Sequence, residues 1–297
     1  MITTPKQNIL ISFSGGETSG FMLQHILNNY SNHNIEVVFA NTGEENEETL
    51  EFVQKCAEYF NVKVTWLEYE RLGFKIVDYT TAYRSHNKKE IENKWQNHPF
   101  RKYISEFGIP NLQSMTCTRE LKEYIINRYL TSIKWKPSNH TKAIGIRADE
   151  IDRIGKLWYP LVFLGTTKPF VNNYWDKMPF RLNLKGYQGN CKTCWKKSFR
   201  KLVTIMRYNP EWFSFMRQME IEYEEFVRET RKDKVKPPVR FFRTNKTVSD
   251  ILEMSKDLSI LDAIDDSRDT NYQISMWKDG TELDVSNGCT ESCEVFL

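Results

Sequence analysis

Short apolar runs alternate with amphipathic helical stretches through the N-terminal part of the chain, and this alternation limits the possible folds more than any other feature. The runs have the character of buried strands and cover residues 8–14, 35–41, 62–69 and 142–148. Between the second and third runs, apolar residues recur at spacings of three and four, which marks the buried face of a helix. These residues are Leu50, Val53, Ala57 and Phe60. Strands that alternate with helices form parallel sheets covered on both faces, so the sequence predicts an α/β fold.

The composition is that of a soluble globular protein. Of 297 residues, 40% are hydrophobic and 27% are charged, and the formal net charge is +3. No apolar run reaches the length of a membrane span, and the N-terminus lacks the long apolar stretch of a secretory signal. We therefore expect a cytoplasmic protein with no membrane partner. The net charge is too small to indicate a nucleic-acid-binding protein by itself, so only local basic clusters are informative.

The rhythm of strands and helices breaks at residues 75–115, which are polar, basic and aromatic. This segment is either an insertion over an active site or partner surface, or a solvent-exposed helical segment. Beyond Gly186 the pattern changes to amphipathic helices, followed by a basic segment at 231–246. We predict an α/β domain over residues 1–185, which includes the insertion, and a mainly helical region over residues 186–297.

The stretch SFSGGETSGF, residues 12–21, joins the first predicted strand to a helix. Gly15 and Gly16 fall in the turn, and Thr18 and Ser19 fall at the helix start, where unpaired N–H groups and the helix dipole favour an anion. Glycines let the backbone approach a phosphate, and hydroxyl groups add donors. A plain strand-to-helix turn is the alternative. The candidate cofactor-binding residues are Ser12, Ser14, Gly15, Gly16, Glu17, Thr18 and Ser19.

The core of this stretch, SGGETS, resembles the SGGxDS-type loop of the PP-loop ATP pyrophosphatases and of their relatives, the phosphoadenosine phosphosulfate (PAPS) reductases. Thr18 stands where many members carry aspartate. Further stretches are similar to elements of PAPS reductase-like proteins frequent in phage and bacterial genomes. They are FANTGEENEETLEF (39–52), CTRELK (117–122), GIRADEIDR (145–153), YPL (159–161) and GNCKTCWKK (189–197). The resemblance implies a doubly wound parallel sheet of the PP-loop (HUP-like) type, with an adenine nucleotide bound at the carboxyl ends of the strands.

Two motifs offer further contacts to that nucleotide. The resemblance places the turn after the second strand near the nucleotide, where a ribose or adenine would be contacted. That turn consists of Asn41, Thr42 and Gly43. Lys122 lies one turn beyond Arg119 on a predicted helix and is either an anion contact or a surface residue.

Arg147 follows the fourth predicted strand and is followed closely by Asp149 and Glu150. Its guanidinium suits a phosphate, and the carboxylates suit Mg²⁺ or hold the arginine in place. A surface ion-pair network is the alternative. We predict Lys122, Arg147 and Asp149 as catalytic residues, with Arg147 also binding the nucleotide, and expect magnesium if ATP is cleaved.

Cys191 and Cys194 form a CxxC, a spacing that lets two thiolates bind one metal or form a disulfide. Cys117 begins a predicted helix, and the tail adds Cys289 and Cys293. Relatives that thiolate tRNA or sulfur-modify DNA hold a [4Fe–4S] cluster with scattered cysteines, and the resemblance implies such a cluster here, with either tail cysteine as the fourth ligand. Structural zinc is the leading alternative, and a redox CxxC without metal is another.

These features lead to the hypothesis of an enzyme that binds ATP or a PAPS-like adenylyl nucleotide. It would couple α-phosphate chemistry to sulfur transfer or reduction at the cysteine-bound cluster, with a sulfur donor or reductant as partner. The nearest alternative is a PAPS or adenosine phosphosulfate reductase that releases sulfite after attack by a cysteine. A third is a non-catalytic nucleic-acid-binding (tRNA or DNA) or defence module with structural zinc, suggested by basic and aromatic residues at 84–102 and 231–246.

Overall fold

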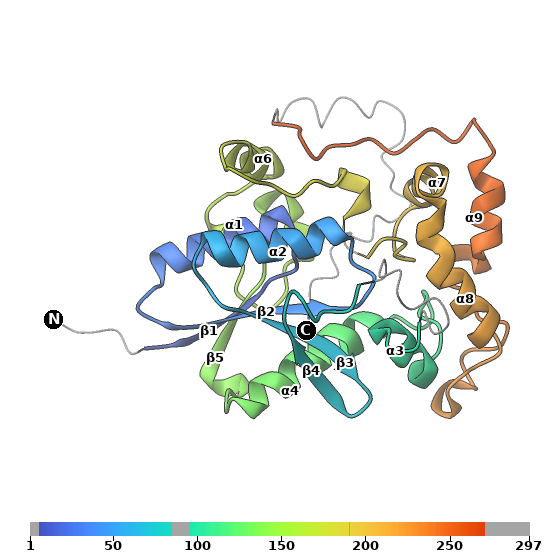
Figure 1. Ribbon diagram of the computed structural model, residues 1–297, viewed down its shortest axis with the longest axis horizontal. Helices are drawn as coiled ribbons and strands as arrows, with labels where there is room; N and C mark the ends of the chain where they lie inside the picture. Colours follow the sequence, from blue (N-terminus) through green and yellow to red (C-terminus); the bar gives the residue numbers. More distant parts are fainter. Residues whose placement is uncertain (1–5, 85–94, 190, 271–297) are drawn as a thin grey trace.

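The structure is a computed structural model that describes residues 6–84, 95–189 and 191–270. Within these residues the strands form one sheet in the order β4-β3-β2-β1-β5 (Figure 1). All neighbouring strands are parallel except the edge strand β4, which runs antiparallel to β3. The predicted α/β fold with a doubly wound, mainly parallel sheet is confirmed. The strands are β1 (Asn8–Ser12), β2 (Asn34–Asn41), β3 (Val64–Glu70), β4 (Gly73–Val77) and β5 (His140–Ala143).

Helices cover both faces of the sheet because successive side chains of each strand point to opposite faces. Ile9 and Ile11 of β1 pack with α1, α2 and α6 on one face, whereas Leu10 packs with α3 and α4 on the other. The sheet is therefore buried on both sides, as parallel sheets usually are. The helices are α1 (Glu17–Asn29), α2 (Glu47–Tyr59), α3 (Pro99–Phe107), α4 (Ile125–Ser132), α5 (Pro160–Phe163) and α6 (Lys168–Asp176).

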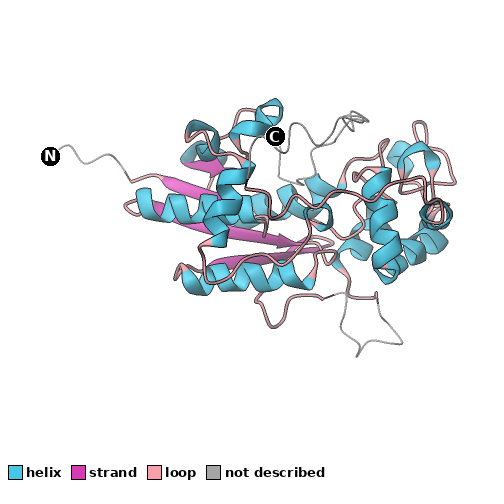
Figure 2. Cartoon of the chain, turned by 90° about the horizontal axis from the view of Figure 1, so that it is seen from above, coloured by secondary structure: helices cyan, strands magenta, loops and turns pink. Residues whose placement is uncertain are grey.

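The described part of the C-terminal region is mainly helical, as predicted. Its helices α7 (Phe199–Tyr208), α8 (Ser214–Tyr223) and α9 (Val248–Ser255) gather at the end of the molecule away from the N-terminus (Figure 1), and Figure 2 shows the helices at that end from above. Side chains from this region and from the sheet belong to one hydrophobic cluster, which includes Leu202, Phe241 and Ile251 as well as Leu10 and Tyr69. The helical region therefore shares a core with the sheet face that α3 and α4 also cover.

The order of the strands defines where a ligand can enter. β1 has β2 on one side and β5 on the other, so the direction in which strands are added reverses at β1. In open α/β sheets, ligands bind in the crevice outside the carboxyl ends of the strands at such a reversal. The segments that leave the sheet there are residues 13–19, after β1, and residues 144–153, after β5.

Two segments differ from the sequence-based expectation. The strand predicted over 142–148 ends at Ala143, because the chain turns toward α1: a Cβ on Gly145 would lie 3.1 Å from the Cα of Ser19. Within the predicted insertion, Tyr103 and Ile104 of α3 are fully buried, so this helix is part of the core. Within the described residues, no helix has the length and apolar character needed to cross a membrane.

Candidate functional site

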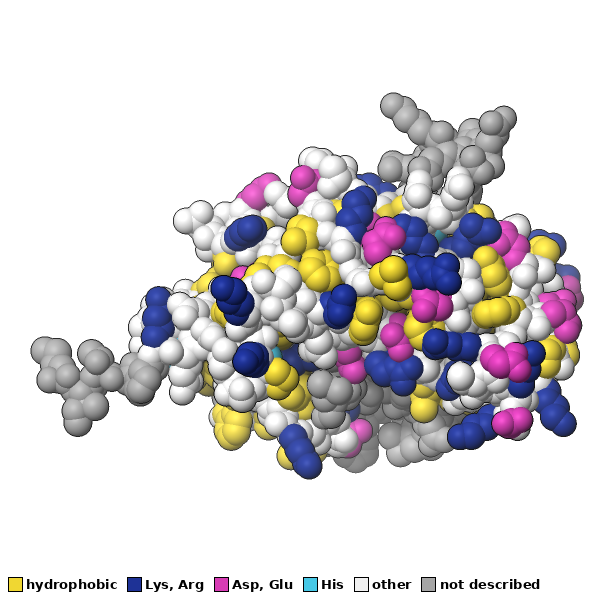
Figure 3. Space-filling model, turned by 90° about the horizontal axis from the view of Figure 1, so that it is seen from below, with side chains coloured by type: hydrophobic (Ala, Val, Ile, Leu, Met, Phe, Trp, Pro, Cys, Tyr) yellow, Lys and Arg dark blue, Asp and Glu magenta, His cyan; other side chains and the backbone are white. Residues whose placement is uncertain are grey.

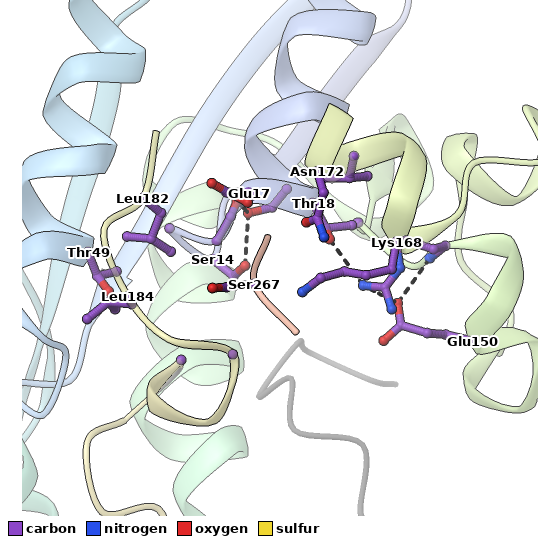
Figure 4. Close-up of a pocket in the computed structure, with 18 of the residues that line it drawn as sticks. Ser14, Glu17, Thr18, Thr49, Glu150, Lys168, Asn172, Leu182, Leu184 and Ser267 are labelled. Atoms are coloured by element: carbon purple, nitrogen blue, oxygen red, sulfur yellow. Dashed lines mark hydrogen bonds and ion pairs between the residues drawn. The ribbon is translucent and has the colours of Figure 1, made fainter. Parts of the chain in front are cut away.

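The loop after β1 forms the floor of a cavity of about 160 Å³ at the carboxyl end of the sheet (Figure 4). Gly15 has a φ of +79°, and a Cβ at this position would lie 2.6 Å from Cγ2 of Thr49. Only glycine adopts this conformation without strain in so little space. We call this space the loop cavity. From the predicted cofactor-binding set, it is lined by Ser14, Gly15, Gly16, Glu17, Thr18, Ser19 and Arg147.

The beginning of α1 supplies donors to this cavity. Gly16 occupies the N-cap position and has no side chain with which to cap the helix. The first-turn residues Glu17, Thr18 and Ser19 line the cavity, so their end of the helix dipole favours an anion there. The hydroxyl of Ser19 donates to the carbonyl of Gly16 at 2.9 Å and lies 2.9 Å from the Ser14 hydroxyl. The hydroxyl groups are thus held in fixed positions.

Arg147 lies in the segment that follows β5 and contacts the loop after β1. Its Nη1 donates to the Thr18 hydroxyl at 3.2 Å. Its Nε donates to Asp149 at 2.9 Å, and Glu150 lies 3.2 Å from Nη1. Asp149 also accepts from the backbone N–H of Lys168, at the start of α6. The carboxylates therefore hold the guanidinium in place, and Arg147 is aimed at the loop.

Glu17, which adds a negative charge to the loop after β1, is paired with Arg181. Nε and Nη2 of Arg181 donate to its two carboxylate oxygens at 2.9 and 3.0 Å. Burial raises the pKa of Glu17, and the guanidinium acts in the opposite direction. The indole N–H of Trp175 donates to the Glu17 carbonyl at 2.8 Å. Glu17 therefore fixes the loop rather than offering a free carboxylate to a ligand.

The sequence did not indicate several other residues that line the loop cavity. Asn172 of α6 is fully buried, and its Nδ2 donates to the carbonyls of Asp266 and Asp269 at 3.2 and 2.6 Å. The segment 262–269, which we call the strap, is thereby held beside the cavity. Ser267 of the strap lines it (Figure 4). The further basic lining residues are Arg153, Lys168 and Lys185.

The turn after β2, residues 41–43, does not line the loop cavity. Asn41 donates to Glu68 at 2.7 Å, and Gly43, at a φ of +86°, fits under His98: a Cβ would lie 2.7 Å from the imidazole Cε1. Thr42 donates to Glu45 at 2.9 Å and lines a different cavity. None of these three residues lines the loop cavity, so their contact with a ribose or adenine stays a prediction.

That different cavity, of about 20 Å³, brings together the three described cysteines that were predicted as metal ligands: Cys117, Cys191 and Cys194. All are buried, at 7 to 8% exposure. Lys122 also lines this cavity, rather than the loop cavity. We call it the cysteine cavity. Among the described residues, no group of three or more Cys, His, Asp or Glu side chains is arranged to hold a metal ion. Cys289 and Cys293 lie outside the described residues.

The CxxC segment is fixed to the turn after β2. Cys191 forms an isolated β-bridge with Glu45, and the N–H of Lys192 donates to the carbonyl of Glu44 at 2.8 Å. The Thr42 hydroxyl lies 3.6 Å from the Cys191 sulfur. Burial raises the pKa of Glu45, which Lys122 opposes. Cys56, in contrast, belongs to the core of the α1 and α2 face, where burial raises the pKa of its thiol.

One segment forms a wall of both cavities. Gly186 and Gly189 line the loop cavity, and Cys191 and Cys194 line the cysteine cavity. The ammonium of Lys197 donates to the carbonyls of residues 187 and 189 at 2.9 and 2.6 Å, which fixes this wall. The two cavities are therefore neighbours.

Comparison with known proteins agrees with this geometry. Residues 8–150 match the family model described as the phosphoadenosine phosphosulfate reductase domain. The matched range includes the loop, Cys117 and Arg147, whereas the CxxC and the strap lie beyond it. The curated protein described as uncharacterized nin region protein ORF290, from Escherichia phage lambda, is 28% identical over 201 residues. The alignment covers 65% of this chain and 67% of that protein.

Proposed function

We propose that this chain is an enzyme that binds ATP or another adenylyl nucleotide in the loop cavity, because residues 8–150 match the family model of the phosphoadenosine phosphosulfate reductase domain. We further propose that it couples chemistry at the α-phosphate to sulfur transfer or reduction at the cysteine cavity. The observation that carries the proposal is the contact between Arg147 and Thr18, which joins a guanidinium to a glycine turn at the reversal of the sheet.

The chemistry of phosphates explains how a site of this kind can stabilise the transition state of a reaction at the α-phosphate. A phosphoryl transition state spreads negative charge over several oxygens and is stabilised mainly by fixed donors. The N–H groups of the first turn of α1, the hydroxyl of Thr18, which accepts from Arg147, and the guanidinium of Arg147 are donors of this kind. In the proposed reaction, an acceptor oxygen attacks the α-phosphorus, and the bond to the bridging oxygen breaks. Pyrophosphate leaves with the electron pair, and a sulfide from a sulfur donor then attacks the acceptor carbon and displaces AMP, which leaves with the acceptor oxygen.

The cysteine cavity supplies the second half of the proposal. Three buried thiols on one cavity are the donor type that zinc and iron–sulfur clusters prefer, and the fourth ligand would be Cys289 or Cys293. An iron–sulfur cluster, when bound, would supply electrons for sulfur reduction, whereas zinc would hold the wall in place.

Calorimetric titration with ATP, adenosine phosphosulfate and PAPS tests the nucleotide site. We expect Thr18→Val and Arg147→Met to weaken binding by about tenfold or more, since a hydrogen bond to a charged group contributes roughly 1.5–3 kcal/mol. Arg128→Met, on the exposed side of α4, is the matched control and should bind as the parent does. If the unmodified protein binds none of the three nucleotides, the proposal is wrong.

The second candidate function is a true PAPS reductase, which the description of the matching family model favours. In this reaction a thiolate attacks the sulfur of the adenylyl sulfate and displaces the nucleotide; a second thiol then releases sulfite and leaves a disulfide. The products separate the two candidates. Pyrophosphate from ATP supports the first function, and sulfite from PAPS with a dithiol reductant supports the second.

A further inference from the structure

A third cavity lies outside both proposed sites. It is a groove of about 600 Å³ between residues 111–113 and residues 233–245. Its rim is at the surface, because Lys234, Lys236 and the prolines 237 and 238 are exposed. We call it the basic groove.

Basic side chains dominate this groove. Four cationic residues line it against one acidic residue, Asp233. The cationic residues are Lys234, Lys236, Arg240 and Arg243. Arg240 is paired with Glu224, but neither Lys234 nor Lys236 has a carboxylate within ion-pair distance among residues 6–84, 95–189 and 191–270. Two of the four charges are therefore available to an anion.

The charge of the whole protein does not account for this cluster. Basic, acidic and apolar side chains are interspersed on the face shown in Figure 3, and the chain carries a net charge of only +3. Long-range attraction of an anion by the whole protein is thus weak. Binding must come from the groove's own side chains.

Apolar and amide groups lie beside the cations. Leu112 is 53% exposed, and Pro237 and Pro238 add flat apolar faces. Gln113 and Asn245 are exposed and carry amides, which both donate and accept hydrogen bonds. A free inorganic anion would use only the lysines. A ligand that uses the whole groove carries negative charge, apolar rings and hydrogen-bonding edges.

The turn that forms one end of the groove is strained. Thr244 and Asn245 have φ values of 53° and 60°, and the residues on either side, Phe242 and Lys246, form an isolated bridge. A β-branched residue in this conformation costs on the order of 1–3 kcal/mol, and such strain gathers at ligand-binding sites. Asparagine tolerates the conformation, but threonine does not.

The groove is connected to the cysteine cavity. Nη2 of Arg243 donates to the carbonyl of Lys196 at 2.7 Å, and Nζ of Lys196 donates to the Thr118 hydroxyl at 3.5 Å. Thr118 lines the cysteine cavity. Arg243, which lines the groove, thus contacts the segment that carries the CxxC.

We propose that the basic groove binds single-stranded nucleic acid. Lys234 and Lys236 contact its phosphates, while Leu112 and the two prolines pack against bases whose edges meet the amides. Among nucleic acids, an unpaired strand offers both a phosphate backbone and exposed base faces. The proposal goes beyond the nucleotide chemistry above and does not depend on it.

Fluorescence anisotropy with a labelled oligothymidine and a labelled RNA of equal length tests the groove over a range of salt concentrations. We expect Lys234→Ala/Lys236→Ala to weaken binding by about tenfold. The slope of log K against log salt should fall by about 1.4, because each phosphate contact on a single strand contributes roughly 0.7. The charge-matched control is Lys55→Ala/Lys256→Ala, which removes two exposed lysines that pair with acidic neighbours.

Several outcomes overturn the proposal. One is an unmodified protein that binds neither oligonucleotide, and another is an equal loss in the control and groove variants. Tighter binding of a duplex or of a phosphorylated peptide would assign the groove to that ligand instead. Calorimetry with ATP on the groove variant keeps the two sites apart, since its affinity in the loop cavity should be unchanged.

Discussion

Glu17 and Arg181 form a buried ion pair in which Nε and Nη2 of the arginine donate to the two carboxylate oxygens at 2.9 and 3.0 Å. The same guanidinium donates to the backbone carbonyl of Ser267 at 2.9 Å. One arginine thus connects the loop after β1 to the strap. It also neutralises the negative charge that Glu17 would otherwise place beside a phosphate.

Replacing Arg181 with methionine should weaken both folding and nucleotide binding. Both side chains of the pair are 12% exposed, so the variant leaves a carboxylate buried without its partner. Removing one member of a buried pair costs about 3–5 kcal/mol. Urea unfolding and nucleotide titration measure the two losses. Adding Glu17→Gln should restore most of the stability, and a double variant no more stable than the single one would contradict this explanation.

Gly15→Ala should abolish nucleotide binding and destabilise the fold by about 2 kcal/mol, since alanine adopts a positive φ poorly. The added methyl group would also meet Cγ2 of Thr49 at 2.6 Å. Gly16→Ala is the control for stability alone, because a Cβ there would lie 3.8 Å from the Ser14 hydroxyl. Combining Gly15→Ala with Thr49→Ser removes the clash but not the φ strain, so thermal unfolding should show partial recovery. Full recovery would mean that the backbone conformation is unimportant.

Glu220 predicts a pH dependence of stability. Burial raises the pKa of this α8 carboxyl to about 7, from 4.5. Between these values the folded protein holds a proton that the unfolded chain releases, so stability falls as the pH rises through this window. The difference corresponds to roughly 3 kcal/mol. Glu220→Gln should flatten the dependence in urea unfolding between pH 4.5 and 8. Glu253→Gln, at an exposed site, should leave it unchanged.

Cys194→Ala should reduce the metal bound after purification without oxygen, because it removes one of three thiols from the cysteine cavity. Elemental analysis and visible absorption distinguish the centres: iron, sulfide and a brown colour support the cluster, and one colourless zinc supports the alternative. Cys56→Ala is the matched control, since Cys56 lies in the core of the other sheet face. Unchanged metal content in Cys194→Ala would exclude this ligand.

Local pattern was enough to predict β1, β2, β3 and the glycine turn. Alternation and helical spacing are properties of short segments, and the turn needs glycine for reasons of backbone conformation alone. β4 escaped prediction because residues 73–77 belong to a stretch with few aliphatic runs. α3 was hidden in the same way, although its apolar side chains are buried.

The features of the candidate site that the sequence did not predict depend on contacts between distant segments. Glu17 and Arg181 are 164 residues apart, and no local pattern links them. The surroundings of Asn41 and Gly43 also depend on distant contacts, because Asn41 donates to Glu68 and Gly43 lies against His98, and neither residue lines the loop cavity. The presence of three cysteines on one cavity was anticipated from the spacing of the CxxC and a family resemblance. For the basic groove, the sequence showed a basic and aromatic segment at 231–246 but not the cavity that it lines.

The wall shared by the loop and cysteine cavities implies thermodynamic linkage between their occupants. If a metal centre pushes the CxxC outward, Gly186 and Gly189 move with it, and the affinity for nucleotide changes. Linkage is reciprocal, so the nucleotide must alter the affinity for metal by the same factor. Sulfur chemistry and nucleotide occupancy would then be synchronised without any long-range conformational change.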